Sequence, residues 1–124
     1  MSQPIRILIV DDHPVVREGI LHYFDDSTKH DVVAAVTSPK EALAILESRE
    51  VDIIILDIRM PEGVDESTIA SFVDRGIRII LFSLMEESCV VASFIEAGAM
   101  GFVSKAETLE TLAEATFAVA RGGR

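Results

Sequence analysis

The sequence predicts an α/β fold: a single doubly wound, five-stranded parallel sheet with helices on both faces. The first observation is a run of β-branched and aliphatic residues within Val51–Leu56, which suits a strand covered on both faces. The second is that four further apolar runs alternate with stretches of helical periodicity, the pattern of right-handed βαβ units. The third is Asp57, which follows the central run and so falls at the carboxyl edge of the sheet, where open α/β folds bind ligands.

Each predicted strand is a short apolar run that ends at polar or turn-forming residues. The segment between the first helix and the second strand, residues 25–31, is polar and is expected to be a loop. The predicted strands cover Ile5–Val10, Val32–Val36, Val51–Leu56, Ile77–Phe82 and Gly101–Ser104.

The predicted helices rest on apolar residues spaced three and four apart and on residues that favour helix ends. Pro14 suits the first turn of the first helix, and Ser38–Glu41 matches a capping box with proline at the first helical position. Gly76 and Gly98 are expected to end two later helices. The apolar faces comprise Val16, Gly19, Ile20, Tyr23 and Phe24; Ala42, Ile45 and Leu46; Ile69, Phe72 and Val73; residues within 87–97; and Leu109, Leu112, Ala113, Thr116, Phe117 and Ala120.

Length and composition indicate one ordered domain, assigned to residues 1–121, followed by the start of a linker at residues 122–124. An apolar fraction of 49% argues against disorder. No apolar run approaches the roughly 20 residues of a membrane span, and the amino terminus lacks the pattern of a signal peptide. We therefore expect a cytoplasmic protein without a membrane partner.

Net charge and cysteine content argue against nucleic-acid binding and against an intrachain disulfide. The 21 acidic residues outnumber the 11 basic ones, and the resulting net charge of −10 repels nucleic acid and attracts cations. Direct binding of nucleic acid by this domain is therefore not expected. Cys89 is the single cysteine, which excludes an intrachain disulfide, and we expect it to be a buried, inert thiol.

Side chains of complementary chemistry follow four of the predicted strands: Asp11 and Asp12, Asp57, Ser83, and Lys105. Because parallel strands end at one edge of a sheet, these residues are expected to meet. Clustered carboxylates repel one another, and a hard divalent cation such as Mg²⁺ relieves that repulsion. A lysine and a hydroxyl opposite them complete the groups needed to position and neutralise a phosphoryl group, for which an aspartate can be the nucleophile.

These residues resemble the receiver domain of two-component response regulators over essentially the whole chain. The resemblance rests on Asp11-Asp12, the block Leu56–Pro61, Ser83, and Gly101–Lys105. The segments 11–19 and 98–102 are most similar to the branch that carries a C-terminal LuxR/NarL-type helix-turn-helix output domain. The resemblance implies a flavodoxin-like topology with strand order 2-1-3-4-5.

The resemblance also implies a phosphoacceptor site. Asp57 would accept a phosphoryl group from a phosphohistidine of a sensor histidine kinase. Asp12, Asp57 and the main-chain carbonyl of Arg59 would hold Mg²⁺ as the cofactor, with Asp11 acting largely through water. The domain would assist its own phosphorylation and dephosphorylation without being an enzyme that turns over external substrates.

A conformational switch is implied by the same resemblance. Lys105 would pair with the phosphoryl oxygens, Ser83 would donate a hydrogen bond to one of them, and Phe102 would then swing towards the vacated space. This change would control an attached DNA-binding domain of the full-length protein and so regulate transcription. Homodimerisation on phosphorylation is a further expectation.

Two positions depart from the family pattern. Asp65 stands where the family often has glycine, with Gly63 nearby, and is expected to add a carboxylate close to the metal site. Leu84 stands where the family often has a small residue, and is expected to restrict access to Asp57. Both departures are expected to affect the rates of phosphoryl exchange at Asp57 more than the function itself.

Simpler explanations exist for each residue taken alone. Asp57 and the Asp11-Asp12 pair could be turn or capping residues, Lys105 a solvated surface lysine, and Phe102 ordinary core packing; their joint occurrence favours the functional interpretation. His13 is expected to be a loop or capping residue.

Three other functions were weighed against phosphoryl transfer to Asp57. The main alternative is a phosphorylation-independent interaction module with the same fold. An aspartate-nucleophile phosphatase typically needs a second aspartate two residues after the nucleophile, a position that Arg59 or His13 occupies here. A flavin carrier needs a Ser/Thr/Gly-rich loop after the first strand, unlike segment 11–14.

Overall fold

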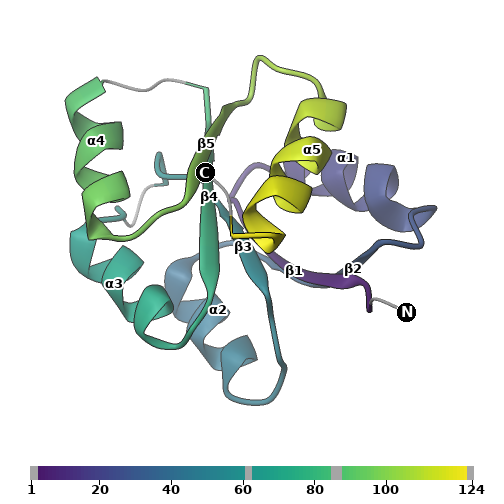
Figure 1. Cartoon of the computed structure of the whole chain (residues 1–124), viewed down its shortest axis with the longest axis horizontal. Helices are drawn as coiled ribbons and strands as arrows, with labels where there is room; N and C mark the ends of the chain where they lie inside the picture. Colours follow the sequence, from purple (N-terminus) through teal and green to yellow (C-terminus); the bar gives the residue numbers. More distant parts are fainter. Residues whose placement is uncertain (1–2, 61–62, 85–87, 123–124) are drawn as a thin grey trace.

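Five short strands pair in parallel in the order β2-β1-β3-β4-β5 in the computed structural model, which describes residues 3–60, 63–84 and 88–122 (Figure 1). This order and the alternation with helices confirm the predicted doubly wound, flavodoxin-like fold. The strands are β1 (Ile5–Val10), β2 (His30–Val36), β3 (Ile53–Leu56), β4 (Arg78–Ser83) and β5 (Gly101–Ser104).

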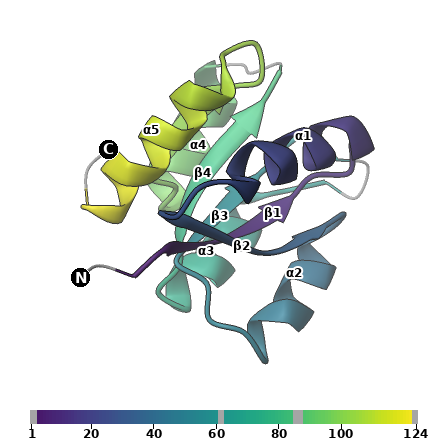
Figure 2. The ribbon, with the colours of Figure 1, turned by 90° about the vertical axis from the view of Figure 1, so that its right-hand side faces the viewer.

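Helices cover both faces of the sheet (Figures 1 and 2). On one face lie α1 (Pro14–Asp25) and α5 (Leu109–Ala120); on the other lie α2 (Pro39–Leu46), α3 (Glu66–Asp74) and α4 (Ser88–Ala97). Within the described residues, no helix has the length and hydropathy needed to cross a bilayer.

The central strand β3 divides the core into two layers. Ile53 and Ile55 pack with α1 and α5, whereas Ile54 and Leu56 pack with α2, α3 and α4. Successive side chains of a strand point to opposite faces, so a strand covered on both faces must be apolar throughout. This is why the central run shows no polar alternation, and it gives the site that follows β3 a rigid support.

Three predicted strands have shifted boundaries; β4 covers Arg78–Ser83 instead of Ile77–Phe82. β3 begins at Ile53 instead of Val51, because Asp52 accepts hydrogen bonds from Arg6 N and Nε at 2.8 and 3.2 Å and leaves the apolar layer. β2 begins at His30 instead of Val32, and His30 pairs with Ile5. The segment that was predicted as a loop up to Asp31 is therefore shorter.

The predicted capping box before α2 is half correct. Ser38 Oγ accepts a hydrogen bond from Glu41 N at 3.2 Å, as expected of an N-cap. The Glu41 carboxylate does not return to Ser38 N but accepts from Thr37 N at 2.7 Å and from Thr37 Oγ1 at 2.8 Å. Thr37 offers two donors where Ser38 would offer one, and these bonds lower the pKa of Glu41.

The ends of α3 and α4 follow the glycine prediction. Gly76 has φ +81° and Gly98 has φ +125°, conformations that side chains rarely adopt. A Cβ at Gly98 would also lie 2.8 Å from Val73 Cγ2, so this glycine permits the close packing of α3 and α4.

Cys89 was predicted to be buried, and this prediction is wrong, because the thiol lies on the exposed side of α4. Phe94 is the buried anchor of that helix. Cys89 precedes it by five positions, which places it roughly 140° around the helix from the core-facing side.

A buried histidine links α1, β2 and α5. Thr116 Oγ1 donates to Ala113 O at 2.6 Å, so His30 Nε2 must donate to Thr116 Oγ1 at 2.8 Å. His30 Nδ1 then accepts a hydrogen bond from Ser27 Oγ at 2.8 Å. Burial lowers the pKa of His30, and the positive charge of Lys29 lowers it further. The neutral imidazole therefore stabilises the contact between the start of β2 and α5.

Acidification is expected to weaken this contact. The folded protein binds a proton at His30 less readily than the unfolded chain, so the free energy of unfolding falls as pH drops through the ordinary histidine value of about 6.5. Urea unfolding between pH 7.5 and 5.5 should show a steeper decline for wild type than for His30→Gln, by at most about 1.4 kcal/mol per pH unit. The exposed His22→Gln variant should behave as wild type; equal slopes for wild type and His30→Gln would contradict the prediction.

Candidate functional site

The carboxyl edge of the sheet brings the predicted site residues together. Asp11 follows β1, Asp57 follows β3, Ser83 ends β4 and Lys105 follows β5. Val10 pairs with Leu56 in the sheet, so the residues that follow them, Asp11 and Asp57, lie side by side at the sheet edge. Main-chain hydrogen bonds extend through the site: Asp57 N donates to Val10 O at 2.9 Å, and Lys105 N donates to Ser83 O at 2.9 Å. The sheet itself therefore fixes these backbones.

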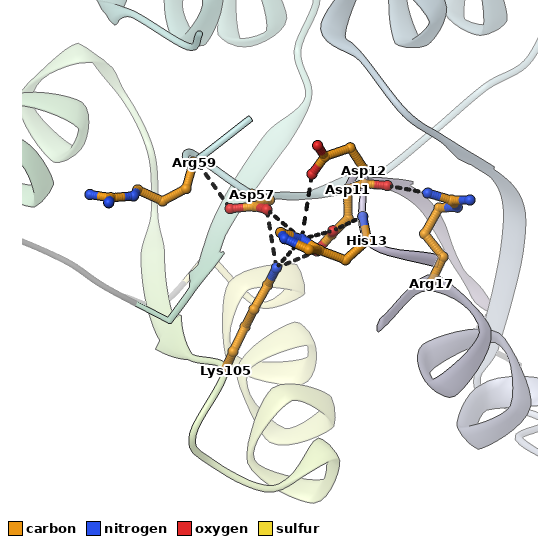
Figure 3. A network of polar contacts seen from close by, with 7 residues as sticks. All are labelled: Asp11, Asp12, His13, Arg17, Asp57, Arg59 and Lys105. Carbon is orange, nitrogen blue, oxygen red and sulfur yellow. Dashed lines mark hydrogen bonds and ion pairs between the residues drawn. The ribbon is translucent and has the colours of Figure 1, made fainter. Parts of the chain in front are cut away.

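An acidic cluster lies at this edge. Asp11 and Asp57 are 2% and 1% exposed, and the side chain of Asp12 is 27% exposed. One potential ligand atom from each of Asp11, Asp12, His13 and Asp57 lies within 4.8 Å of the others. Figure 3 shows these side chains converging from the ends of β1 and β3.

Lys105 is the cation that the fold places against this cluster. Its Nζ lies 2.7 Å from Asp11 Oδ2 and 3.1 Å from Asp57 Oδ2, and its side chain is only 5% exposed. Three carboxylates face one ammonium group, so the carboxylates of this cluster outnumber its lysine by two. Lys105 is therefore not a solvated surface residue but part of the buried charge cluster.

The cluster has oxygen atoms that the described residues do not satisfy. Asp11 Oδ2 and Asp12 Oδ1 are enclosed and accept no hydrogen bond from the described part of the chain. Lys105 forms an ion pair with Asp11 Oδ2 by distance, but not a hydrogen bond. Enclosed carboxylate oxygens with excess negative charge are the donors that a hard divalent cation prefers, so the residues present fit a Mg²⁺ site.

The segment after Asp57 turns sharply around its carboxylate. Arg59 N donates to Asp57 Oδ1 at 2.9 Å, while Asp57 Oδ2 accepts from Lys105 Nζ. Figure 3 shows the Arg59 side chain extending away from the cluster, so only its main chain is near the acidic groups. Pro61, which belongs to the motif in this segment, lies outside the described residues.

Asp57 opens to solvent through a hollow of about 180 Å³. Leu84 lies at this opening with 63% of its surface exposed, and restricted access to Asp57 stays a prediction. Ser83, which is fully buried as a residue, also faces the hollow. The lining residues are His13, Asp57, Arg59, Ser83, Leu84 and Lys105.

Phe102 lies on β5 beside this region. It pairs with Leu81 of β4 and is partly buried against the core layer that includes Phe94 of α4. Phe102 is not among the residues that line the hollow in front of Asp57.

Asp65 does not join the acidic cluster, and the expectation of an added carboxylate at the metal site is wrong. Asp65 is the N-cap of α3: its Oδ1 accepts hydrogen bonds from Ser67 Oγ at 2.6 Å and Thr68 N at 3.0 Å. The hydroxyl of Ser67 is the main cause of its lowered pKa. A carboxylate that caps a helix in this way is held away from the site.

Sequence reasoning placed His13 at a loop or cap but missed the side-chain contacts of His13 and Arg17. His13 is the N-cap residue of α1 but makes no capping hydrogen bond with its side chain; its imidazole lies in the acidic cluster instead. Arg17 Nη1 donates to Asp11 O at 2.8 Å and braces the loop after β1. The available signals were that His13 lies two residues after Asp11 and that Arg17 lies one helical turn later.

The fold and site define a class of α/β domain: a five-stranded parallel sheet whose carboxyl edge carries an acidic cluster and a lysine with a buried side chain. The model of the response regulator receiver domain matches residues 7–117. The chain belongs to this family.

Curated relatives of the chain are transcriptional regulatory proteins. It is 30% identical over 121 residues to the transcriptional regulatory protein LnrK of Bacillus subtilis, covering 96% of this chain and 55% of the relative. It is 34% identical over 119 residues to the transcriptional regulatory protein UhpA of Escherichia coli, covering 96% and 60%. The chain thus spans little more than half the length of these relatives.

Solved structures agree with this assignment. A LuxR-family two-component response regulator from Aurantimonas has a TM-score of 0.88 at 30% identity, with 98% of this chain and 88% of that chain covered. The signal receiver domain of NarL from Mycobacterium tuberculosis has a TM-score of 0.87 at 28% identity, with 98% and 99% covered.

Removal of Lys105 is expected to destabilise the domain, because its loss leaves Asp11 and Asp57 without their buried cation. The Lys105→Met variant should lose about 3 kcal/mol of unfolding free energy, the lower end for breaking a buried ion pair. The exposed Lys40→Met variant removes the same charge and serves as the control. Urea unfolding at pH 7.5 measures both, and equal losses in the two variants would show that Lys105 has no special role in the cluster.

Proposed function

We propose that residues 1–121 form the phosphorylatable receiver of a NarL/LuxR-type transcriptional response regulator, and that a linker to a DNA-binding output domain begins at residue 122. The observation that carries this proposal is Asp57, a buried carboxylate between Lys105 and the Asp11-Asp12 pair that opens to solvent through one hollow. No other carboxylate among the residues lining that hollow is available as an acceptor.

The proposed reaction transfers a phosphoryl group from a phosphohistidine of a sensor histidine kinase. A carboxylate oxygen of Asp57 attacks phosphorus, the P–N bond breaks, and the departing imidazole takes up a proton. The acyl phosphate adds charge at a site that is already negative. Lys105, now 3.1 Å from Asp57 Oδ2, neutralises part of this charge. Asp57 Oδ1 is held by Arg59 N, which keeps the carboxylate oriented.

Mg²⁺ is the proposed cofactor, and it supplies charge neutralisation at the phosphoryl group when bound. Asp12, Asp57 and the main-chain carbonyl of Arg59 would hold it, with Asp11 acting largely through water. The enclosed Asp12 Oδ1, which accepts no hydrogen bond from the described residues, supports this assignment.

The signal would leave the site through Ser83 and Phe102. The Ser83 hydroxyl would bond to a phosphoryl oxygen and draw its loop inwards, and Phe102 would follow into the space beside α4. Two conformations of similar energy, biased by one local charge, constitute a switch. Phe102 of β5 is partly buried against the core layer that includes Phe94 of α4, which supports this route.

The remaining elements of the proposal concern partners. The histidine kinase docks at the Asp57 hollow, a homodimer forms on phosphorylation, and DNA is bound by the output domain and not by this acidic receiver, whose net charge is −10. The domain assists its own phosphoryl transfer and hydrolysis in the cytoplasm without turning over external substrates.

A phosphorylation-independent interaction module is the second candidate. It is favoured by Leu84, which is 63% exposed at the opening of the hollow, and by the imidazole of His13, which already contacts the three carboxylates. Both groups restrict the space in front of Asp57.

The mass of the intact protein after incubation with acetyl phosphate and Mg²⁺ distinguishes the two candidates. Wild type should gain one phosphoryl group only when Mg²⁺ is present, and Asp57→Asn should gain none because the nucleophile is gone. Asp31→Asn, an exposed matched control, should react as wild type. A wild type that gains no mass and does not bind beryllofluoride would favour the interaction module.

Leu84→Ala should speed the same reaction severalfold, because it widens the opening to Asp57 without altering the charged groups. Initial rates with acetyl phosphate measure the effect, and Val90→Ala on α4, also partly exposed, is the control. An unchanged rate would mean that Leu84 does not limit access.

A further inference from the structure

The imidazole of His13 points into the acidic cluster, although nothing in its backbone position requires this. His13 Nδ1 lies 2.9 Å from Asp11 Oδ1, 3.4 Å from Asp12 Oδ1 and 3.3 Å from Asp57 Oδ2 (Figure 3). The side chain is 52% exposed, so burial of the ring contributes little to this arrangement. The polar groups of the cluster therefore determine where the ring lies.

His13 Nδ1 and Asp11 Oδ1 are within hydrogen-bond distance in the absence of an ion, and the separations in the cluster also match those of donor atoms that share one metal ion. With metal–ligand distances of about 2.1 Å, neighbouring donors lie about 3.0 Å apart in an octahedron and about 3.4 Å apart in a tetrahedron. The three distances from His13 Nδ1 to carboxylate oxygens, 2.9 to 3.4 Å, fall in this interval. Little rearrangement is needed for one ion to contact the imidazole and the carboxylates together.

Independent evidence for a ligand comes from the carboxylates. Asp11, which is 2% exposed, directs Oδ2 into the cluster, where its partner is the Lys105 ammonium group at 2.7 Å, and the enclosed Asp12 Oδ1 accepts no hydrogen bond from the described residues. Lys105 Nζ is close to Asp11, Asp57 and His13 Nδ1, but its charge opposes every divalent ion equally. Selection between ions therefore depends on the donor atoms and not on this charge.

We infer that His13 is a ligand of the cation site and gives it a mixed nitrogen–oxygen donor set. The inference deepens the proposed function, since it concerns the same cation site. An imidazole nitrogen is a good donor to Mn²⁺, Co²⁺ and Zn²⁺, whereas Mg²⁺ retains oxygen donors and water. His13 thus raises the affinity for transition-metal ions relative to Mg²⁺, and the receiver binds them in preference.

Calorimetric titration of the unphosphorylated domain with Mg²⁺, Mn²⁺ and Co²⁺ tests this inference. His13→Phe should weaken Co²⁺ binding at least about tenfold, the lower end of the loss expected for a metal-site residue, and should change Mg²⁺ binding by less than about twofold. His13→Asn keeps a polar side chain and should lose the same preference. His22→Phe, which removes an exposed histidine from the same helix, should bind as wild type and controls for adventitious binding.

A spectroscopic measurement detects the bond between the His13 nitrogen and the metal ion directly. The electron spin echo of bound Mn²⁺ should show modulation from a directly bonded nitrogen in wild type and in His22→Phe, and this modulation should be absent in His13→Phe. Thermal unfolding of each variant without metal checks that the fold is intact.

The outcomes separate the inference from the proposed function. If His13→Phe keeps the wild-type ratio of Co²⁺ to Mg²⁺ affinity, or the nitrogen modulation persists, His13 is not a ligand and the inference is overturned; phosphorylation of Asp57 with Mg²⁺ would still stand. If wild type takes up no phosphoryl group but binds Co²⁺ through His13, the inference holds and the proposed function fails. If no ion binds, both fail.

Discussion

The constraint on which this domain depends is the packing of three carboxylates against one buried ammonium group. Asp11 and Asp57 are almost fully buried, and Lys105 forms ion pairs with both. Mutual repulsion would separate or protonate such groups if their backbones were free to move. The backbones of Asp11, Asp57 and Lys105 are held in place, because their main-chain amides donate to carbonyls of neighbouring strands. The sheet therefore holds an excess of negative charge at one edge, and the residues there fit a divalent cation.

The apolar sheet is what allows that charge to be held. Each residue of β3 is at most 1% exposed, and burial of one such side chain contributes about 1.5–3 kcal/mol. Burying an incompletely paired ion costs several kcal/mol, so a few core side chains offset the cost of the cluster. Asp57 directly follows this strand, so the fully buried β3 supports a buried charged group. The same arrangement explains why the strand has no polar residue before Asp57 beyond Asp52, which is held by Arg6 at the opposite edge.

The sequence predicted the fold and the meeting of Asp11, Asp57, Ser83 and Lys105 because both follow from periodicity and from the geometry of parallel strands. What it did not predict depends on contacts between distant segments. β2 extends to His30 because Thr116, from α5, satisfies the buried ring, and no local pattern signals that partner. The loop position of His13 was expected, but the direction of its imidazole is decided by carboxylates from two strands. Cys89 and Asp65 were misjudged for a related reason: residue type alone did not show that one lies on the outer side of α4 and the other caps α3.

Few residues separate the charged site at Asp57 from the surface formed by β5 and its neighbours. Lys105 and Ser83 are joined by a main-chain hydrogen bond of 2.9 Å, so the residue that pairs with Asp57 and the residue that lines its hollow move as neighbours in one ladder. Phe102 lies three residues before Lys105 on that ladder and packs towards α4. Under the proposed function, a phosphoryl group on Asp57 would act on Lys105, whose Nζ forms an ion pair with Asp57 Oδ2 at 3.1 Å. The proposed switch would then couple the surface around β5 to Asp57 through two paired strands, without a longer pathway.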